Sequence, residues 1–140
     1  YTEAMTLAHE RRLPVLIHTW GGSPLCGPAQ IRTLAARYPN AILILGHGLY
    51  GAWAEACAVA NEHVNTFIEL TAVVGKRGVV ETLVAGAGSD RILYGTDLPW
   101  FDEHVYIGNI LCADIGEDDK HNILHRNAER LLGPILGKAS

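Results

Sequence analysis

Short runs of consecutive apolar residues recur along the chain and indicate buried strands. The four runs cover residues 14–17, 41–45, 66–70 and 91–94. Most of their positions are apolar in succession rather than in alternation, which is typical of strands covered on both faces. Such strands occur in parallel sheets with helices packed against them, so these runs predict a parallel α/β fold.

The stretches between the runs have helical spacing. Two apolar stripes at i, i+3, i+4 and i+7 each cover one helix face; they are Ile31, Leu34, Ala35 and Tyr38, and Trp53, Ala56, Cys57 and Ala60. Further helices are expected over 2–12, over 79–84 and from Glu117 to a stop at Gly133 and Pro134. The buried stripe of the last helix is predicted to be Leu124, Ala128, Leu131 and Leu132.

The strand ends fall near residues 18, 47, 70 and 97, and a spacing of about 25 residues matches consecutive β/α units. Four such units form either a small open sheet or half of a (β/α)₈ TIM barrel, which takes about 250 residues. No linker is visible, so residues 1–140 are expected to be one partial domain. Because Tyr1 already lies in a helical pattern, we expect the natural protein to extend upstream.

Composition narrows the possible partners. The 11 Lys and Arg residues against 15 Asp and Glu give a formal net charge of -4 and no basic block, which argues against nucleic acid as a partner. No apolar run approaches the roughly 20 residues that span a membrane. The three cysteines form no C-x-x-C pair, which fits free thiols in a reducing compartment, and we expect a cytoplasmic location.

Polar side chains follow the apolar runs where the strands are predicted to end. His18, His47 and Asp97 come at or just after three of the runs, and Glu69 lies near the end of the fourth. The carboxyl ends of parallel strands gather at one face of the sheet, where ligands bind. Imidazole nitrogen and carboxylate oxygen both bind divalent metals such as Zn²⁺. His18 and Asp97 therefore predict a metal site at this face, with His47 beside it.

Purely structural roles remain open for the same residues. A histidine at a strand end can be a hydrogen-bonded wall residue, an aspartate before a helix can be a cap, and Glu69 can pair with a neighbour inside a barrel. Trp20 and Trp100 follow candidate ligands and would wall a substrate pocket or pack within loops. Glu69 would contact the substrate if it does not make such a structural pair. The other histidines, for which we expect no ligand role, are His9, His63, His104, His121 and His125.

A second motif competes with the metal site. Residues 46–51 read Gly-His-Gly-Leu-Tyr-Gly and match G-x-G-x-x-G after a strand and before a helix, with Glu69 about 20 residues downstream. This is the pattern of a dinucleotide-binding module. It leaves His18 and Asp97 unexplained, whereas the metal site uses His47 as well.

The strand ends and the last helix, taken together, resemble those of the amidohydrolase-related (amidohydrolase family 2) group. This group contains metal-dependent hydrolases and non-oxidative decarboxylases. The segments that carry the resemblance are 14–18, 44–48, 90–100 and 122–133. Gly-Thr-Asp-x-Pro and Asn-Ala-x-Arg-Leu, within the last two, are the most specific. The resemblance implies that the chain is the C-terminal half of a TIM barrel, strands five to eight.

The resemblance also implies roles for three residues. His18 would be a metal ligand, His47 would polarise the substrate or orient water, and Asp97 would bind the metal and take a proton from the attacking water. The family's first strand supplies two more ligands from a His-x-His pair, and this sequence contains no such pair. We therefore expect this stretch alone to be inactive, and to exist as a homo-oligomer or to need the N-terminal half-barrel.

The leading prediction is a metal-dependent hydrolase that acts on a small amide, lactone or ester, with a divalent cofactor that is zinc, manganese or another ion. The nearest alternative is a metal-dependent decarboxylase of a small aromatic or unsaturated acid, because the same ligands serve both reactions. Further alternatives are the dinucleotide-binding module and a non-catalytic half-barrel that assembles with a partner chain.

Overall fold

The computed structural model describes residues 1–73 and 75–137 and contains one four-stranded sheet. Its parallel strands lie in chain order as β1 (Pro14–Trp20), β2 (Ile42–Tyr50), β3 (Thr66–Glu69) and β4 (Ile92–Leu93). The register places Leu16 beside Ile44 and Ile44 beside Phe67. The prediction of a parallel α/β fold is confirmed.

Helices connect the strands, as the sequence pattern predicts. They are α1 (Thr2–Arg11), α2 (Pro28–Arg37), α3 (Trp53–Glu62), α4 (Val79–Ala87), α5 (Glu103–Leu111), α6 (Glu117–His121) and α7 (Asn127–Leu136), with a 3-10 turn at Ser89–Arg91 and a π turn at Asn122–Arg126. Pro28 occupies the first turn of α2, where a missing N–H costs nothing. Among the described residues, no helix is long and apolar enough to cross a lipid bilayer.

Helix α5 was not expected, although its sequence carries a readable signal. The Asp102 side chain accepts a hydrogen bond from the His104 backbone N–H at 2.8 Å and caps the helix start. Tyr106 and Ile110, four residues apart, are buried and supply the apolar stripe.

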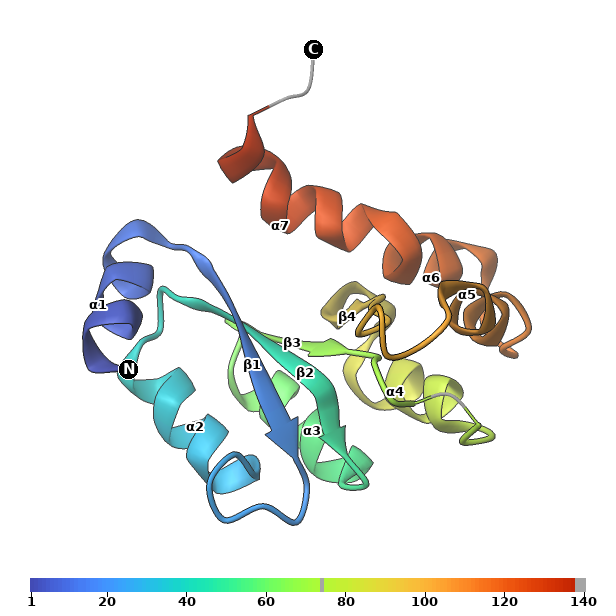
Figure 1. The fold of residues 1–140 in the computed structure, drawn as a ribbon, viewed down its shortest axis with the longest axis horizontal. Coiled ribbons are helices and arrows are strands. Elements are labelled where there is room, and N and C mark those ends of the chain that lie inside the picture. Colours follow the sequence, from blue (N-terminus) through green and yellow to red (C-terminus); the bar gives the residue numbers. More distant parts are fainter. Residues whose placement is uncertain (74, 138–140) are drawn as a thin grey trace.

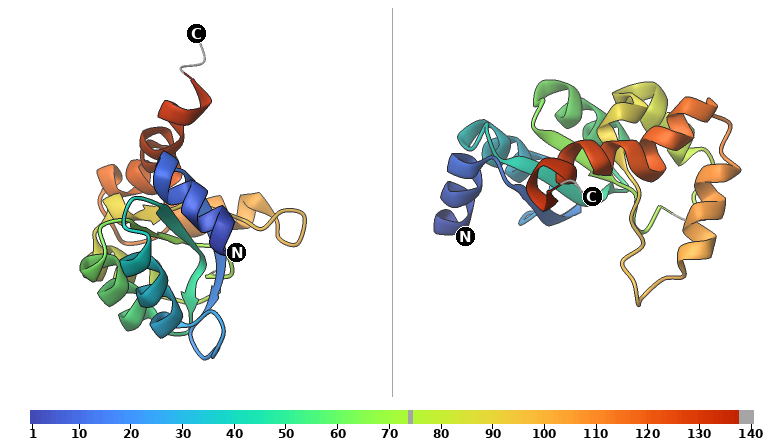
Figure 2. Two further views of the ribbon diagram at one scale, coloured as in Figure 1. Left: turned by 90° about the vertical axis from the view of Figure 1, so that its left-hand side faces the viewer. Right: turned by 90° about the horizontal axis from the view of Figure 1, so that it is seen from above.

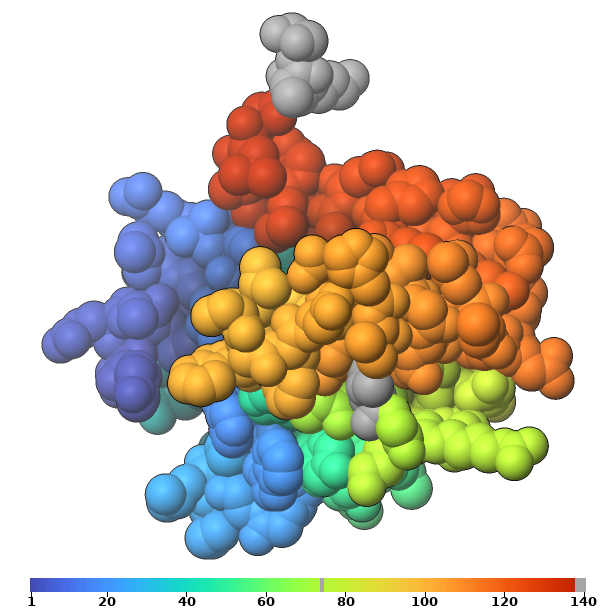
Figure 3. Space-filling view, turned by 45° about the vertical axis from the view of Figure 1, so that its right-hand side comes forward, coloured from blue at the N-terminus to red at the C-terminus, as the bar shows by residue number. Residues whose placement is uncertain are grey.

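The two faces of the sheet are covered unequally. Helices α2 and α3 lie on one side and α7 on the other (Figures 1 and 2). In the space-filling view the C-terminal part, coloured orange to red, forms a layer beside the blue and green part (Figure 3). All of β3 and β4 is buried. The expectation that every strand is covered on both faces is wrong for β1, where Leu16 is 68% exposed because no helix covers it.

The C-terminal helix differs from its prediction in two ways. It continues past Gly133 and Pro134 to Leu136, so the expected stop is wrong. Proline has no backbone N–H, so Pro134 leaves one helical carbonyl without its donor. This carbonyl lies near the exposed end of the helix, where water can bind it. The predicted stripe is only half-buried, while Ile123 and Asn127 are the buried positions. The reason is that Ala128, Leu131 and Leu132 face a pocket.

Asn127 ties this helix to the end of the sheet. Its side chain is 1% exposed, and its Nδ2 donates to the carbonyl oxygens of Ser89 (2.8 Å) and Ile92 (2.7 Å). Ile92 begins β4. The bond therefore fixes the short strand that leads to Asp97.

Asn127→Ala is expected to lower the free energy of unfolding by about 2–4 kcal/mol, because two buried carbonyls lose their donor. Urea unfolding measures this change. Asn61→Ala is the matched control, since its Nδ2 also donates to a carbonyl, that of Gly86, but at an exposed position. Equal losses in the two variants would contradict the anchoring role.

Candidate metal-dependent active site

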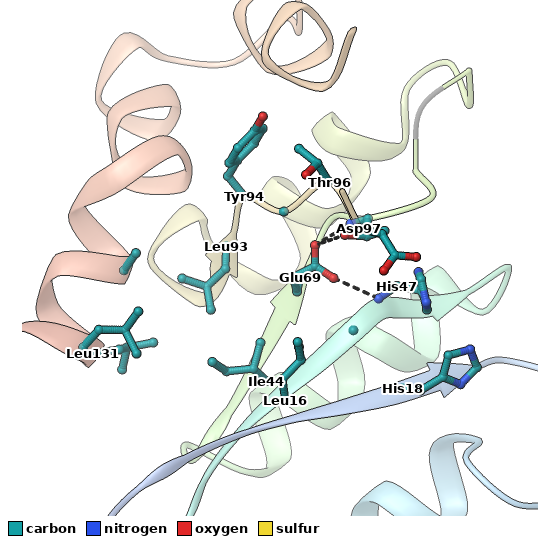
Figure 4. A pocket seen from close by; sticks show the side chains of 15 residues that line it. Leu16, His18, Ile44, His47, Glu69, Leu93, Tyr94, Thr96, Asp97 and Leu131 are labelled. Atoms are coloured by element: carbon teal, nitrogen blue, oxygen red, sulfur yellow. Dashed lines mark hydrogen bonds between the residues drawn. The ribbon is translucent and has the colours of Figure 1, made fainter. Parts of the chain in front are cut away.

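The carboxyl ends of the strands open into a pocket of about 540 Å³. His18 comes from β1, His47 from β2 and Asp97 from the segment after β4, and all three line it. The ring centroids of His18 and His47 are 4.9 Å apart. Figure 4 shows these three side chains at one end of the pocket and aliphatic ones, among them Leu16, at the other. The structure thus brings the three predicted residues together.

His47 lies on a tightly bent part of β2. Its φ is 66°, in the left-handed region that few non-glycine residues adopt. The buried Thr19 side chain braces this bend, because its Oγ1 donates to the Gly46 carbonyl and accepts from the Leu49 N–H, both at 2.8 Å. Thr19 was not singled out from the sequence, because nothing in its neighbours signals a contact with residues about 30 positions away.

Glu69 lies behind His47 and is 8% exposed. Its Oε2 accepts a hydrogen bond from the His47 backbone N–H at 3.1 Å. Its Oε1 accepts from the Thr71 N–H at 2.7 Å and also from the Thr71 hydroxyl. Both carboxyl oxygens are therefore engaged by the protein, although Glu69 also lines the pocket.

Gly95 gives Glu69 the space it needs. A Cβ at position 95 would lie 1.8 Å from Glu69 Oε1, a separation that no real contact allows. A side chain at this position would therefore displace the carboxylate that holds the His47 backbone.

Asp97 follows β4 and carries an exposed side chain. Its φ is 58°, again in the left-handed region, where aspartate and asparagine are tolerated better than most residues. Its carbonyl accepts from the Trp100 N–H at 2.9 Å, which closes the turn beyond the site. The backbone thus turns sharply at both Asp97 and His47.

The side chains at the pocket are of the types that bind a divalent metal, but they are too few to complete its coordination shell. His18 and Asp97 are exposed at the pocket, and His47 Nδ1 is buried with no hydrogen-bond partner in the described part of the chain. His18 Nδ1 lies 3.6 Å from Cys26 Sγ. Within residues 1–73 and 75–137, the only three candidate ligands whose atoms lie within 4.8 Å of one another are Asp102, Glu103 and His104, all exposed at the start of α5.

The two tryptophans occupy different places. Trp20 stacks on Tyr50 with ring centroids 4.4 Å apart, and its ring lies 5.9 Å from that of His47. Trp20 therefore lies next to His47, although neither it nor Trp100 is among the residues that line the pocket. Trp100 is 80% exposed. Tyr50, which supports Trp20, was not singled out from the sequence.

Tyr94 adds a phenol to the pocket wall. Its hydroxyl donates to the Glu103 carbonyl at 3.2 Å. Burial, and then the negative charges of Glu103 and Asp102, raise the pKa of Tyr94 above its ordinary value. The phenol is therefore neutral at physiological pH, and its O–H hydrogen is used in the bond to Glu103.

The glycine-rich segment lacks the geometry of a dinucleotide site. Residues 46–50 belong to β2, and α3 begins only at Trp53. The backbone N–H groups of His47 and Leu49 donate to Glu69 and Thr19, so they do not point at a ligand. A pyrophosphate site needs such N–H groups free at a helix start.

A parallel β/α sheet whose strand ends carry two imidazoles and a carboxylate has the architecture of metal-dependent barrel enzymes. The chain belongs to the amidohydrolase family (Amidohydro_2), whose model matches residues 1–133. The family resemblance noted from the sequence is thereby confirmed. A comparison with curated protein sequences gave no match.

Solved structures share the fold at low identity. An uncharacterised TIM-barrel protein from Bordetella bronchiseptica is 24% identical with a TM-score of 0.81, over 94% of this chain and 50% of that one. A 2,6-dihydroxybenzoate decarboxylase complexed with 2,6-dihydroxybenzoate is 20% identical with a TM-score of 0.73, over 98% and 56%. A dihydroxybenzoic acid decarboxylase from Polaromonas sp. JS666, with manganese and 2-nitroresorcinol, is 18% identical with a TM-score of 0.67, over 90% and 51%. The chain thus spans about half the length of these TIM-barrel relatives.

Proposed function

We propose that this chain is the C-terminal half of a metal-dependent TIM-barrel enzyme that decarboxylates a small aromatic or unsaturated acid. The observation that carries the proposal is the convergence of His18, His47 and Asp97 on one pocket, with the Trp20 ring beside His47. An aromatic ring next to these polar groups suits a planar substrate. The two decarboxylases of similar fold, which act on dihydroxybenzoates by name, support the choice.

His18 and Asp97 would hold the divalent ion, zinc or manganese by their ligand chemistry. When bound, such an ion acts as a Lewis acid on the oxygen atoms of the substrate. Decarboxylation breaks the bond between the ring carbon and the carboxyl group, releases CO₂ and leaves an electron pair on that carbon. Asp97 and His47 are the pocket groups that can carry the proton which this carbon must receive.

Hydrolysis of a small ester, lactone or amide is the second candidate. The specific observation in its favour is the position of His47, an imidazole held on a braced bend at the polar end of the pocket. Asp97 would take a proton from water, and His47 would donate a hydrogen bond to the developing oxyanion.

The proposal requires further ligands, because catalytic zinc usually has three from the protein and His18 and Asp97 are two. We propose that they come from strands beyond this sheet, either the N-terminal half-barrel or a second copy of the chain. The exposed Leu16, on the same strand as His18, supports this placement, since an apolar inner face needs a cover.

Chelation with EDTA is expected to reduce turnover at least about 100-fold, and Mn²⁺ or Zn²⁺ is expected to restore it. In the assay, the full-length protein is incubated with a panel of hydroxybenzoates and CO₂ release is measured. In parallel, hydrolysis of a panel of aryl esters, lactones and amides is measured. CO₂ release alone favours decarboxylation and hydrolysis alone favours the second candidate. Turnover that survives chelation would contradict both.

A further inference from the structure

Two histidines and a glutamate line the outer face of the C-terminal helix, away from the pocket. His121, His125 and Glu129 are spaced four residues apart, and all three side chains are exposed. His121 Nδ1 lies 3.1 Å from His125 Nε2, and His125 Nδ1 lies 3.1 Å from Glu129 Oε1. The strand-end argument gave these histidines no ligand role, and the fold nevertheless brings their nitrogen atoms together.

We propose that His121 and His125 form a second metal site, which binds a first-row transition ion such as Cu²⁺, Ni²⁺ or Zn²⁺. Two nitrogens 3.1 Å apart, each about 2.05 Å from one ion, subtend an angle of about 98° at that ion. This angle lies between the octahedral and tetrahedral values. The two imidazoles are therefore spaced as neighbouring ligands of one metal ion.

Glu129 gives His125 the protonation pattern that a ligand needs. An ionised carboxylate only accepts hydrogen bonds, so His125 Nδ1 donates to Glu129 and His125 Nε2 keeps its lone pair. That lone pair faces His121 Nδ1. A carboxylate behind an imidazole is a common support of metal-binding histidines. In the neutral pair His121 donates from Nδ1, and metal binding moves that proton to its Nε2, with no net change in protonation.

The opposite face of the helix is anchored, which fixes the backbone that carries the two imidazoles. Asn122 and Asn127, five residues apart across the π turn, both bind Ser89, through its Oγ at 3.0 Å and its carbonyl at 2.8 Å. The π turn makes this spacing possible while His121 and His125 remain outside. Single π turns inside α-helices frequently occur at functional sites.

The nitrogen pair selects a different class of ion from the other exposed cluster. Imidazole suits Cu²⁺, Ni²⁺ and Zn²⁺, and Cu²⁺ binds most tightly of the three. Asp102, Glu103 and His104 offer two carboxylates and one imidazole, a set closer to the preferences of harder ions. Copper capped with iminodiacetate, which leaves two neighbouring positions open, is therefore the appropriate probe for the histidine pair.

The test titrates the full-length protein with Cu²⁺-iminodiacetate and records electron paramagnetic resonance spectra. The wild-type protein is expected to bind Cu²⁺-iminodiacetate, and the spectrum is expected to show two imidazole nitrogens coordinated to the copper. His121→Asn or His125→Asn is expected to weaken this binding at least about 10-fold and to leave at most one imidazole in the spectrum. Glu129→Ala is expected to weaken it by about 10-fold through loss of the supporting carboxylate.

Two control variants locate the probe. His104→Asn removes an exposed histidine that also contacts a carboxylate, and is expected to leave binding unchanged. His18→Asn removes a pocket histidine and is expected to leave the two-imidazole spectrum of the His121–His125 pair unchanged. Loss of binding in His18→Asn but not in the helix variants would assign the copper to the pocket and overturn the proposal, as would unchanged binding in His121→Asn. Because the readout is spectroscopic, failure of this site and failure of the proposed function are separate results.

Discussion

Asp97→Asn is expected to reduce turnover at least about 1,000-fold while leaving the fold intact, because under the proposed function it removes both a metal ligand and a proton-transfer group. The side chain is exposed at the pocket, so the change opens no cavity. Asparagine also tolerates the left-handed region, so the φ of 58° is retained. Asp97→Ala lacks this advantage and would mix backbone strain with loss of function.

The measurement is kcat of the full-length protein with its metal, together with the metal content and the midpoint of thermal unfolding. Asp114→Asn is the matched control, since it makes the same change at an exposed position outside the pocket lining. We expect it to keep wild-type turnover. Asp97→Asn with near-normal kcat and full metal content would exclude Asp97 from the reaction.

The placement of His18, His47 and Asp97 in one pocket could be predicted because it depends on a topological rule. Parallel strands joined by helices present their carboxyl ends at one face, whatever their side chains. A residue that follows an apolar run is therefore placed by the run itself. The rule does not identify the further metal ligands that the proposed function requires, which we propose to lie outside this sheet.

The support of the site could not be predicted, because it depends on contacts between distant positions. Thr19 braces the bend at Leu49, and Gly95 makes room for Glu69. A threonine after a histidine and one glycine among 15 carry no signal of these contacts in a single sequence. The same limit applies to the start of the last helix, because nothing near Asn127 in the sequence signals its bonds to Ser89 and Ile92.

Backbone strain marks the candidate catalytic positions. His47 and Asp97 are two of five described non-glycine residues with positive φ, and both line the pocket. Such conformations persist where surrounding contacts hold them, and they cluster at functional sites. At His47 the contacts are those of Thr19 and Glu69. These contacts favour a positioning role for Glu69 in the proposed reaction, and the substrate contact expected from the sequence stays a prediction, since Glu69 also lines the pocket.

Glu69→Ala is expected to lower the free energy of unfolding by about 3 kcal/mol or more, because two buried donors and one partly buried donor lose their acceptor and a cavity remains. It is also expected to lower kcat about 100-fold, since a shift of about 1 Å in His47 costs that much. Glu69→Gln is expected to lose nearly as much stability and kcat as Glu69→Ala, because its amide N–H₂ would face a backbone N–H, which also donates. Thr71→Val removes only one hydroxyl donor and should cost about 1 kcal/mol.

Urea unfolding and kcat per folded molecule separate the positioning role of Glu69 from general stabilisation. Glu81→Ala is the matched control, because Glu81 Oε1 also accepts a backbone N–H, that of Asp114, at 3.0 Å, but lies outside the pocket lining. We expect Glu81→Ala to lose stability and keep its kcat, whereas Glu69→Ala loses both. If Glu69→Ala keeps its kcat as well, the carboxylate only stabilises the fold, and the bend at His47 holds its shape without it.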